Sequence, residues 1–391
     1  MRRIGTQAFG IRLPIINRGD NLADIVVDSL MAAVETQSLH LKPADVVGIT
    51  EALLAKAQGN FATIDAIGED IRQKFPDGVV GLVFPIFSRN RFLNILKGIA
   101  RGAKKVYVLL QYPHDEVGNP LMRLEDSDKL FDTGKNFFPG DEFREIAGNF
   151  THPFTSIDYI SLYQNVGSNV EVHVSNDPRR ILELTKHVLV GEIHCRMRTK
   201  ERLQQAGAET VYTLSDILSK PINGSGFNPD FGVLGSNLST EEELKLFPRD
   251  SEAFVNLVQT KIAARCGIAP QVMVYGDGAF KDPQAGIWEL ADPVVSPGYT
   301  RGLEGRPNEI KIKYVAENLF KGLSGEEKTV AISEMIREKR KDAEKYSINE
   351  GTTPRNYTDL LGSLCDLISG SGDKGTPVVL IQGYFDDYSC D

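Results

Sequence analysis

A glycine-rich stretch near the C-terminus has the residue types of a phosphate-binding loop. It consists of Gly370, Ser371, Gly372, Asp373, Lys374 and Gly375. Closely spaced glycines let successive backbone N–H groups point at one anion. A dinucleotide fingerprint needs a strand before the glycines and a helix after them, whereas here a helical pattern comes first and the strand pattern PVVLIQG follows. The stretch therefore predicts a ligand loop of another kind, with a plain helix-to-strand connection as the alternative.

An aspartate follows the end of an apolar strand pattern. In VMVYGDGAF, Asp277 lies between two glycines directly after residues 271–275. Ligands of α/β sheets bind at the carboxyl ends of strands, and carboxylate oxygens are the ligands that Mg²⁺ and Mn²⁺ prefer. A metal site and an ordinary Asp-Gly turn are equally good interpretations of this stretch alone.

Two pairs of arginines are candidates for holding an acidic substrate. Arg89 and Arg91 fall at a predicted strand-to-helix junction, and Arg196 and Arg198 alternate at the end of a predicted strand, where they would share one face. Guanidinium groups bind carboxylates and phosphates through paired hydrogen bonds. Solvated surface arginines are the alternative for both pairs.

Strand and helix patterns alternate along the chain and predict an α/β to α+β fold with mixed sheets. The strand pattern at 45–50 leads into a helix that ends at Gly59, and residues 79–112 read as strand, helix and parallel strand. Residues 113–153 predict a long excursion with little regular structure. A short helix is expected after Ser239, where Glu242 completes a capping box.

Composition and charge exclude several classes of protein. The net charge of −9 argues against general nucleic-acid binding. No apolar run approaches the length of a membrane helix, and the N-terminus does not resemble a signal peptide. Four scattered cysteines without a C-x-x-C pair predict a reduced, cytoplasmic protein, and the histidines show no zinc-ligand spacing.

Five segments occur in an order that is typical of one enzyme family. They are GIRLPIINRGDNL with DVVGITEALLAKAQGN, then FGVLGSN, LFPRD, VMVYGDGAF and DLLGSLCDLISGSGDKGTPVVLIQG. Together they resemble motifs of the coenzyme F420-0:gamma-glutamyl ligases. The resemblance implies a ligase-like core in residues 1–60 and 225–391 and an inserted α/β region of unknown role in residues 61–224. Two charged helices near 308–346 also lack a counterpart.

The resemblance implies a ligase that uses GTP or ATP and Mg²⁺ or Mn²⁺. Such an enzyme joins L-glutamate to a small carboxylate, F420-like or folate-like, through an acyl phosphate, and it forms a homodimer. The positions that match nucleotide contacts are a strand segment of Leu13, Pro14, Ile15 and Ile16, together with Thr50, Glu51, Lys56, Asn237 and the residues 370–375. Asp277 matches a metal ligand, and Asp230 and Asp282 are candidates for further metal oxygens. No catalytic residue is assigned.

Three family positions carry different residues here. Leu234 stands where the family has a metal-binding aspartate, Gly278 where it has threonine, and Ser371 where it has an acid. Two alternatives therefore stay open. One is a ligase for a different amine, and the other is a non-catalytic nucleotide-binding or regulatory protein on the same scaffold.

Overall fold

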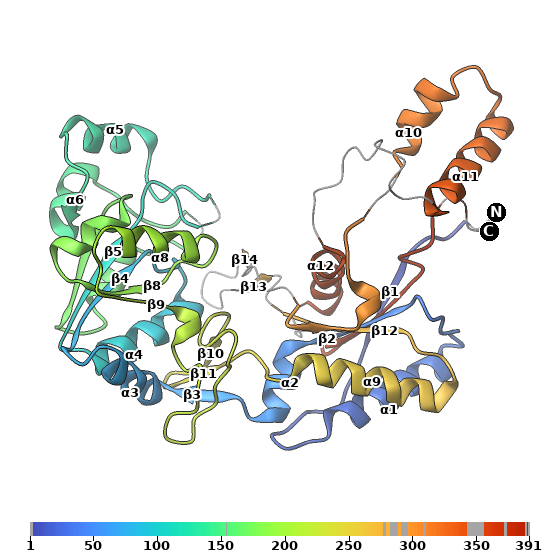
Figure 1. Cartoon of the computed structure of the whole chain (residues 1–391), viewed down its shortest axis with the longest axis horizontal. Coiled ribbons are helices and arrows are strands. Elements are labelled where there is room, and N and C mark those ends of the chain that lie inside the picture. The colour runs from blue at the N-terminus through green and yellow to red at the C-terminus, as the bar shows by residue number, and fades with distance from the viewer. Residues whose placement is uncertain are drawn as a thin grey trace.

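The chain folds into two lobes, each built around its own sheet (Figure 1). The computed structural model describes residues 3–116, 118–153, 155–276, 279–281, 288–290, 296–307, 310–341, 356–370, 374–387 and 389. The first lobe contains a five-stranded sheet in the order β1-β16-β2-β12-β15, and the second lobe a six-stranded sheet in the order β6-β7-β5-β4-β8-β9. Each sheet has parallel and antiparallel neighbours, so the predicted mixed α/β fold is confirmed.

The first lobe is assembled from both ends of the chain and a segment in between. Its strands are β1 (Gln7–Ile11), β2 (Val46–Thr50), β12 (Gln271–Tyr275), β15 (Gly298–Tyr299) and β16 (Val378–Gln382). The helices α1 (Leu22–Thr36), α2 (Glu51–Gln58) and α9 (Ser251–Cys266) pack on one face, and α12 (Tyr357–Ser369) packs on the other. The predicted strand and helix before Gly59 are confirmed, with Gly59 as a left-handed cap at φ 63°.

Helix α12 lies unusually close to the middle of the first-lobe sheet. A β-carbon at Gly48 of β2 would lie only 2.4 Å from Sγ of Cys365 in α12. Glycine at this position therefore lets the helix and the sheet make direct contact. Burial also raises the pKa of the Cys365 thiol, which keeps it protonated at neutral pH.

The second lobe is built from a continuous stretch of chain. Its strands are β4 (Val79–Val83), β5 (Lys105–Leu110), β6 (Phe138–Pro139), β7 (Val170–Val174), β8 (His187–Val190) and β9 (Thr210–Thr213). The helices α3 (Ile64–Lys74) and α4 (Asn94–Gly102) cover one face, while α8 (Arg196–Gln205) and the short helix η2 (Pro178–Glu183) cover the other. Strands β4 and β5 flank α4 and pair in parallel, which confirms the predicted βαβ unit.

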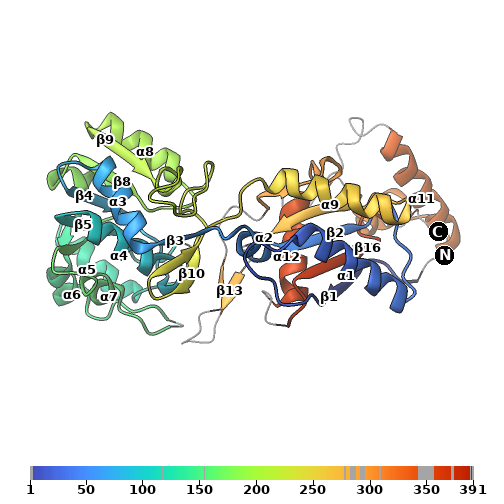
Figure 2. The same cartoon turned by 90° about the horizontal axis from the view of Figure 1, so that it is seen from below.

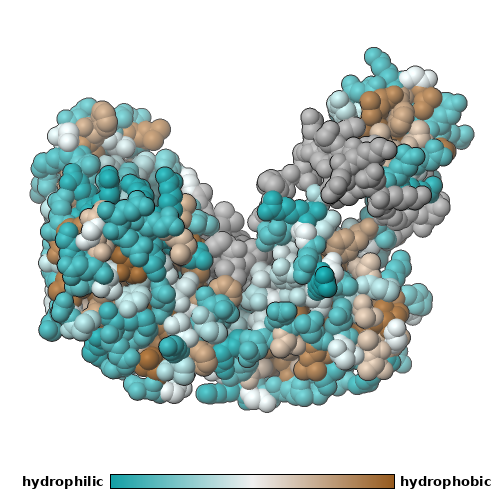
Figure 3. Space-filling view, in the orientation of Figure 1, coloured by the Kyte–Doolittle hydropathy of each residue, from teal (hydrophilic) through white to brown (hydrophobic). Residues whose placement is uncertain are grey.

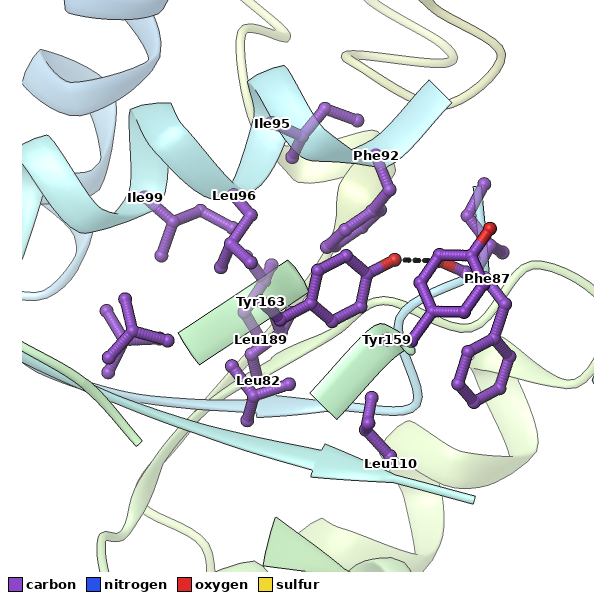
Figure 4. Packing of buried hydrophobic residues seen from close by; sticks show 14 of the residues in the cluster. Leu82, Phe87, Phe92, Ile95, Leu96, Ile99, Leu110, Tyr159, Tyr163 and Leu189 are labelled. Atoms are coloured by element: carbon purple, nitrogen blue, oxygen red, sulfur yellow. Dashed lines mark hydrogen bonds between the residues drawn. The ribbon is translucent and has the colours of Figure 1, made fainter. Parts of the chain in front are cut away.

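Aromatic side chains anchor the loop that follows β4. The hydroxyl of Tyr163, on α7 (Tyr159–Gln164), donates a hydrogen bond of 2.5 Å to the carbonyl of Ile86 (Figure 4). The ring of Phe87 packs edge-on against Tyr159 at a centroid distance of 5.2 Å. These contacts fix the backbone between β4 and the arginine-bearing segment behind it.

A small sheet in the order β10-β11-β3 lies between the two lobes, as the view from below shows (Figure 2). It consists of β3 (Phe61–Thr63), β10 (Asn237–Thr240) and β11 (Glu243–Lys245), and we call it the connecting sheet. The prediction of a short helix after Ser239 is wrong, because this stretch is the β10–β11 hairpin. Leu244 and Leu246 are fully buried while Lys245 between them faces the other way, which is the two-residue period of a strand.

The predicted irregular excursion at 113–153 is also wrong. It contains α5 (Leu124–Asp132), β6 and α6 (Gly140–Ala147). Leu130, Phe143 and Ala147 from these helices are fully buried in the second-lobe core, so this segment gains its regular structure from packing.

The remaining elements extend from these bodies. Strands β13 (Ala279–Lys281) and β14 (Trp288–Leu290) pair between the lobes, and η3 (Leu214–Asp216) and η4 (Arg301–Leu303) are short helical turns. The predicted helical region near 308–346 contains α10 (Ile312–Tyr314), η5 (Val315–Leu319) and α11 (Gly325–Lys341), which form an arm. Across the described ranges, no helix combines the length and the apolar character that crossing a membrane requires.

Candidate functional site

Several of the predicted nucleotide-contacting segments meet at one edge of the first-lobe sheet. Strands β2 and β12 run parallel with Thr50 opposite Tyr275, so Thr50 and Glu51 lie beside the chain that leaves β12. Strand β16 starts at the same edge, where the N–H of Thr50 donates a 3.0 Å hydrogen bond to the carbonyl of Pro377. Strand β1 ends there too, because Ile11 pairs with Val378. We call this place the nucleotide edge.

The segment Leu13 to Ile16 follows the end of β1. Strand β1 ends at Ile11, so the prediction that these residues form a strand is wrong. The N–H of Gly19 donates a 2.8 Å hydrogen bond to the carbonyl of Ala57, which fixes the segment beside the last turn of the helix. Lys56 is exposed on that turn. Ile16 belongs to the same buried cluster as Leu54 and Ala57 of α2.

The glycine-rich loop begins where α12 ends, which confirms the predicted order of helix, glycines and strand. Gly370 adopts φ 58°, the left-handed conformation of a helix C-cap. A β-carbon there would lie 3.1 Å from Cγ of Lys374, so the lysine side chain folds back over this glycine. Ser371, Gly372 and Asp373 lie outside the described residues.

A buried ion pair joins the nucleotide edge to the connecting sheet. Glu51 is only 3% exposed, and its carboxylate pairs with the ammonium group of Lys245 on β11. A β-carbon at Gly276 would lie 2.0 Å from Cγ of Glu51, so a larger residue would have to displace this buried side chain. Asn237 pairs with Lys245 across the hairpin, which brings the predicted contact Asn237 to the same place.

Lys245 is a site residue that the motif comparison does not identify. The signal for it is the alternation in ELKLF, where leucines on either side of the lysine point into the core. The helix expected after Ser239 hides that alternation.

A tyrosine hydroxyl ties β12 to the loop before β16. Oη of Tyr275 donates a 3.4 Å hydrogen bond to the carbonyl of Pro377. Burial raises the pKa of Tyr275, so the phenol stays neutral and keeps its proton as a donor.

The described residues do not compose a complete metal site. Asp277, Gly278 and Asp282 lie outside them. Leu234 is 1% exposed within the second-lobe core, and Asp230 lies in an exposed turn. No group of three or more His, Cys, Asp or Glu side chains in the described ranges could hold a metal ion. Glu51 is the carboxylate that the structure shows beside Gly276, and Lys245 balances its charge.

The arginine pairs lie in the second lobe and differ in their surroundings. Arg89 and Arg91 belong to the π-helical turn η1 (Arg89–Leu93) directly before α4, at the predicted junction. Arg91 is 4% exposed, so the alternative of a solvated side chain is wrong for this residue.

The prediction that Arg196 and Arg198 alternate on one face of a strand is wrong. Strand β8 ends at Val190 and α8 begins at Arg196. Residues two apart in a helix do not face the same way, so the two guanidinium groups separate. Arg196 is half-buried and donates a 2.6 Å hydrogen bond to the carbonyl of Ile193, whereas Arg198 is exposed.

The nucleotide edge faces the second lobe. Helix α2 and strand β13, which follow β2 and β12, lie on the side of the first lobe that is turned toward the second (Figure 1). The space-filling view is hollowed between the two lobes (Figure 3).

Comparisons with known proteins agree with the five sequence segments. A search of curated proteins finds no match to the chain. The family model described as F420-0:gamma-glutamyl ligase matches residues 10–383, a span that includes both lobes. The chain therefore belongs to the F420-0:gamma-glutamyl ligase family.

Proposed function

We propose that this protein is a nucleotide- and metal-dependent ligase that joins the amine of L-glutamate to the carboxylate of a small F420-like or folate-like acid. One observation carries the proposal: segments from distant parts of the chain meet at the carboxyl ends of β2 and β12. This is the part of an α/β sheet where ligands bind. Family membership adds the reaction type, an amide-forming gamma-glutamyl transfer.

The nucleotide edge offers the groups that GTP or ATP needs. Lys374 is an exposed cation on the chain that leads into β16, and Lys56 is exposed on the last turn of α2. A glycine-rich sequence allows backbone N–H groups to bind phosphate oxygens. Ile15 is 84% exposed and offers an apolar surface for a nucleobase. The dependence on Mg²⁺ or Mn²⁺ in this proposal rests on Asp277.

The reaction follows from these groups in two displacements. A carboxylate oxygen of the acid attacks the γ-phosphorus, the bond to the bridging oxygen breaks, and the nucleoside diphosphate leaves with an acyl phosphate remaining. The glutamate nitrogen then attacks the acyl carbon, phosphate leaves, and the nitrogen loses a proton to form the amide. Positioned cations such as Lys56 and Lys374 would stabilise the charge on the phosphoryl oxygens.

A second candidate function is nucleotide binding without catalysis. The buried position of Leu234 favours it, because a side chain in the second-lobe core cannot replace the metal-binding aspartate of the family. The balanced charge of Glu51 points the same way.

A turnover assay separates the two candidates. The full chain is incubated with GTP or ATP, Mg²⁺ or Mn²⁺, L-glutamate and a panel of F420-like and folate-like acids. Phosphate release that requires both the acid and glutamate is the expected result. Tight nucleotide binding without any turnover would instead establish the non-catalytic candidate.

Two lysine variants locate the nucleotide. Lys374→Ala should weaken nucleotide binding by about tenfold or more, because a charged hydrogen bond to phosphate is lost. Lys135→Ala is the matched control, since Lys135 is an exposed second-lobe lysine paired with Glu142. Equal affinities of the two variants, measured by calorimetry, would remove Lys374 from the site.

A further inference from the structure

The second-lobe sheet has a topological switch point of its own. From β4 the chain moves outward through β5 to β7 and then returns to β8 on the other side of β4. The connection after β4 packs on the face of α3, whereas α8 after β8 packs on the opposite face. Connections that leave neighbouring parallel strands on opposite faces open a crevice, and this crevice is where open α/β sheets bind ligands.

The two loops at this crevice are in contact and well supported. The N–H of Gly191 donates a 2.8 Å hydrogen bond to the carbonyl of Val83, and a β-carbon at Gly191 would lie 2.9 Å from Cα of Pro85. The loop after β4 is further held by the hydrogen bond between Tyr163 and Ile86. Pre-formed backbone of this kind is typical of a ligand site.

Each loop leads directly into an arginine. Arg91 follows β4 and is 4% exposed, and Arg196 is the first residue of the helix after β8. Between Ser88 and Arg91, Asn90 is 8% exposed, and its Nδ2 has no hydrogen-bond partner among the described residues. A buried donor without a partner in the protein is suited to a ligand oxygen.

The acidic side chains at these loops are engaged by their own surroundings. The carboxylate of Glu192 accepts a 2.5 Å hydrogen bond from the hydroxyl of Thr199, and that of Glu116 accepts one of 3.2 Å from the N–H of Phe87. Both carboxylates therefore have a donor within their own loops, and the same loops carry the amide of Asn90 and the guanidinium group of Arg196.

We propose that the crevice between β4 and β8 binds an oxyanion group, a carboxylate or a phosphate, of a small molecule. We identify this molecule with the acid to which glutamate is joined, and this identification rests on the proposed function. The connecting sheet supports this link. Nδ2 of Asn94, just after η1, donates a 3.0 Å hydrogen bond to the carbonyl of Thr240 on β10. The same hairpin carries Lys245, which holds Glu51 at the nucleotide edge.

Calorimetry on the full chain, without nucleotide or metal, tests the site directly. The probes are citrate for a carboxylate and inorganic phosphate for a phosphate group. Binding of either probe is expected, and the tighter one names the oxyanion that the crevice prefers. Arg196→Met should weaken that binding about tenfold or more, because a charged hydrogen bond is lost. Arg198→Met, an exposed arginine on the same helix, is the matched control and should bind like the original protein.

Arg91 provides a second, stricter variant. Arg91→Lys keeps the charge but removes the planar fork, so it should weaken binding while circular dichroism stays that of the folded protein. In the turnover assay, Arg196→Met should raise the Michaelis constant for the acid and leave that for the nucleotide unchanged.

Two results would overturn the proposal. One is that neither probe binds, and the other is that Arg196→Met binds as tightly as Arg198→Met. Nucleotide binding is measured separately and depends on Lys374, so these failures would leave the proposed function standing.

Discussion

The two lobes present similar strand ends but arrive at them by different routes along the chain. In the first lobe, the nucleotide edge needs residues 11–16, 50–51, 276 and 374–377 to come together. In the second lobe, the sheet around the crevice is made within residues 79–213. The first site therefore depends on contacts between the two ends of the chain, while the second needs only local closure.

The largest expected effect concerns Leu234, which the structure places in the second-lobe core rather than at the nucleotide edge. Because its side chain is 1% exposed in that core, Leu234→Asp would bury a carboxylate and should lower the free energy of unfolding by more than about 4 kcal/mol. Chemical denaturation measures the effect. Leu238→Asp on the neighbouring strand, at 43% exposure, is the control and should change little. A stable Leu234→Asp protein that gains metal affinity would contradict this assignment.

The next effect concerns the ion pair between the nucleotide edge and the connecting sheet. Lys245→Met removes the ammonium group that pairs with the buried carboxylate of Glu51 and should cost about 3 kcal/mol of unfolding free energy. The double variant Glu51→Gln with Lys245→Met removes both charges and should recover most of that loss. Denaturant titrations of the single and double variants form the test. Additive losses would show that the two residues do not interact.

A smaller effect is expected where α12 touches the first-lobe sheet. Gly48→Ala places a methyl group 2.4 Å from Sγ of Cys365, so the free energy of unfolding should fall by about 1–3 kcal/mol. Gly322→Ala is the control, because a β-carbon there meets no atom within 4 Å. The combination Gly48→Ala with Cys365→Ala should restore part of the stability, and no such recovery would point to a cause other than this contact.

The smallest expected effect is a pH dependence of stability that arises in the second lobe. Burial lowers the pKa of His173 in β7, an effect that its hydrogen bond to Glu171 only partly offsets. The unfolded chain then takes up the proton more readily than the folded one. The free energy of unfolding is therefore highest above the ordinary histidine pKa of about 6.5 and decreases as the pH falls below it. His173→Gln should flatten this decline, whereas His40→Gln, an exposed first-lobe change, should not. Thermal melts at a series of pH values from above to below about 6.5 measure how steeply the stability of each variant falls.

Local patterns predicted the elements that carry the fold, and tertiary packing decided the rest. The strand and helix around Thr50 and Gly59 and the βαβ unit could be predicted because period and capping residues agree there. The hairpin containing Lys245 could not, because a capping-box pattern at Ser239 and Glu242 competes with a short strand alternation that only burial against the second-lobe core resolves. The strand assigned to Arg196 failed for a related reason, since the sequence does not mark where β8 ends and α8 begins.

The sequence pointed to individual residues of the nucleotide edge better than to the contacts between them. Motif order pointed to Thr50 and to the chain before β16, and strand register places these two at one edge, while the nucleotide contacts themselves stay a prediction. It could not reveal the pairing of Glu51 with Lys245, which joins residues far apart in the chain. The separation of Asp230 and Leu234 from that edge likewise depends on how the chain packs.

The close contact between Gly48 and Cys365 makes the reactivity of this thiol a measure of how often α12 separates from the sheet. Cys195 and Cys266 are exposed and would react with a thiol reagent in the folded state, while Cys365 is buried and its thiol is kept protonated. Cys365 can react only when α12 lifts from the sheet, so its labelling rate counts these openings. The same helix ends at Gly370. A nucleotide held by the glycine-rich loop would therefore lower the labelling rate of Cys365 before any product is formed.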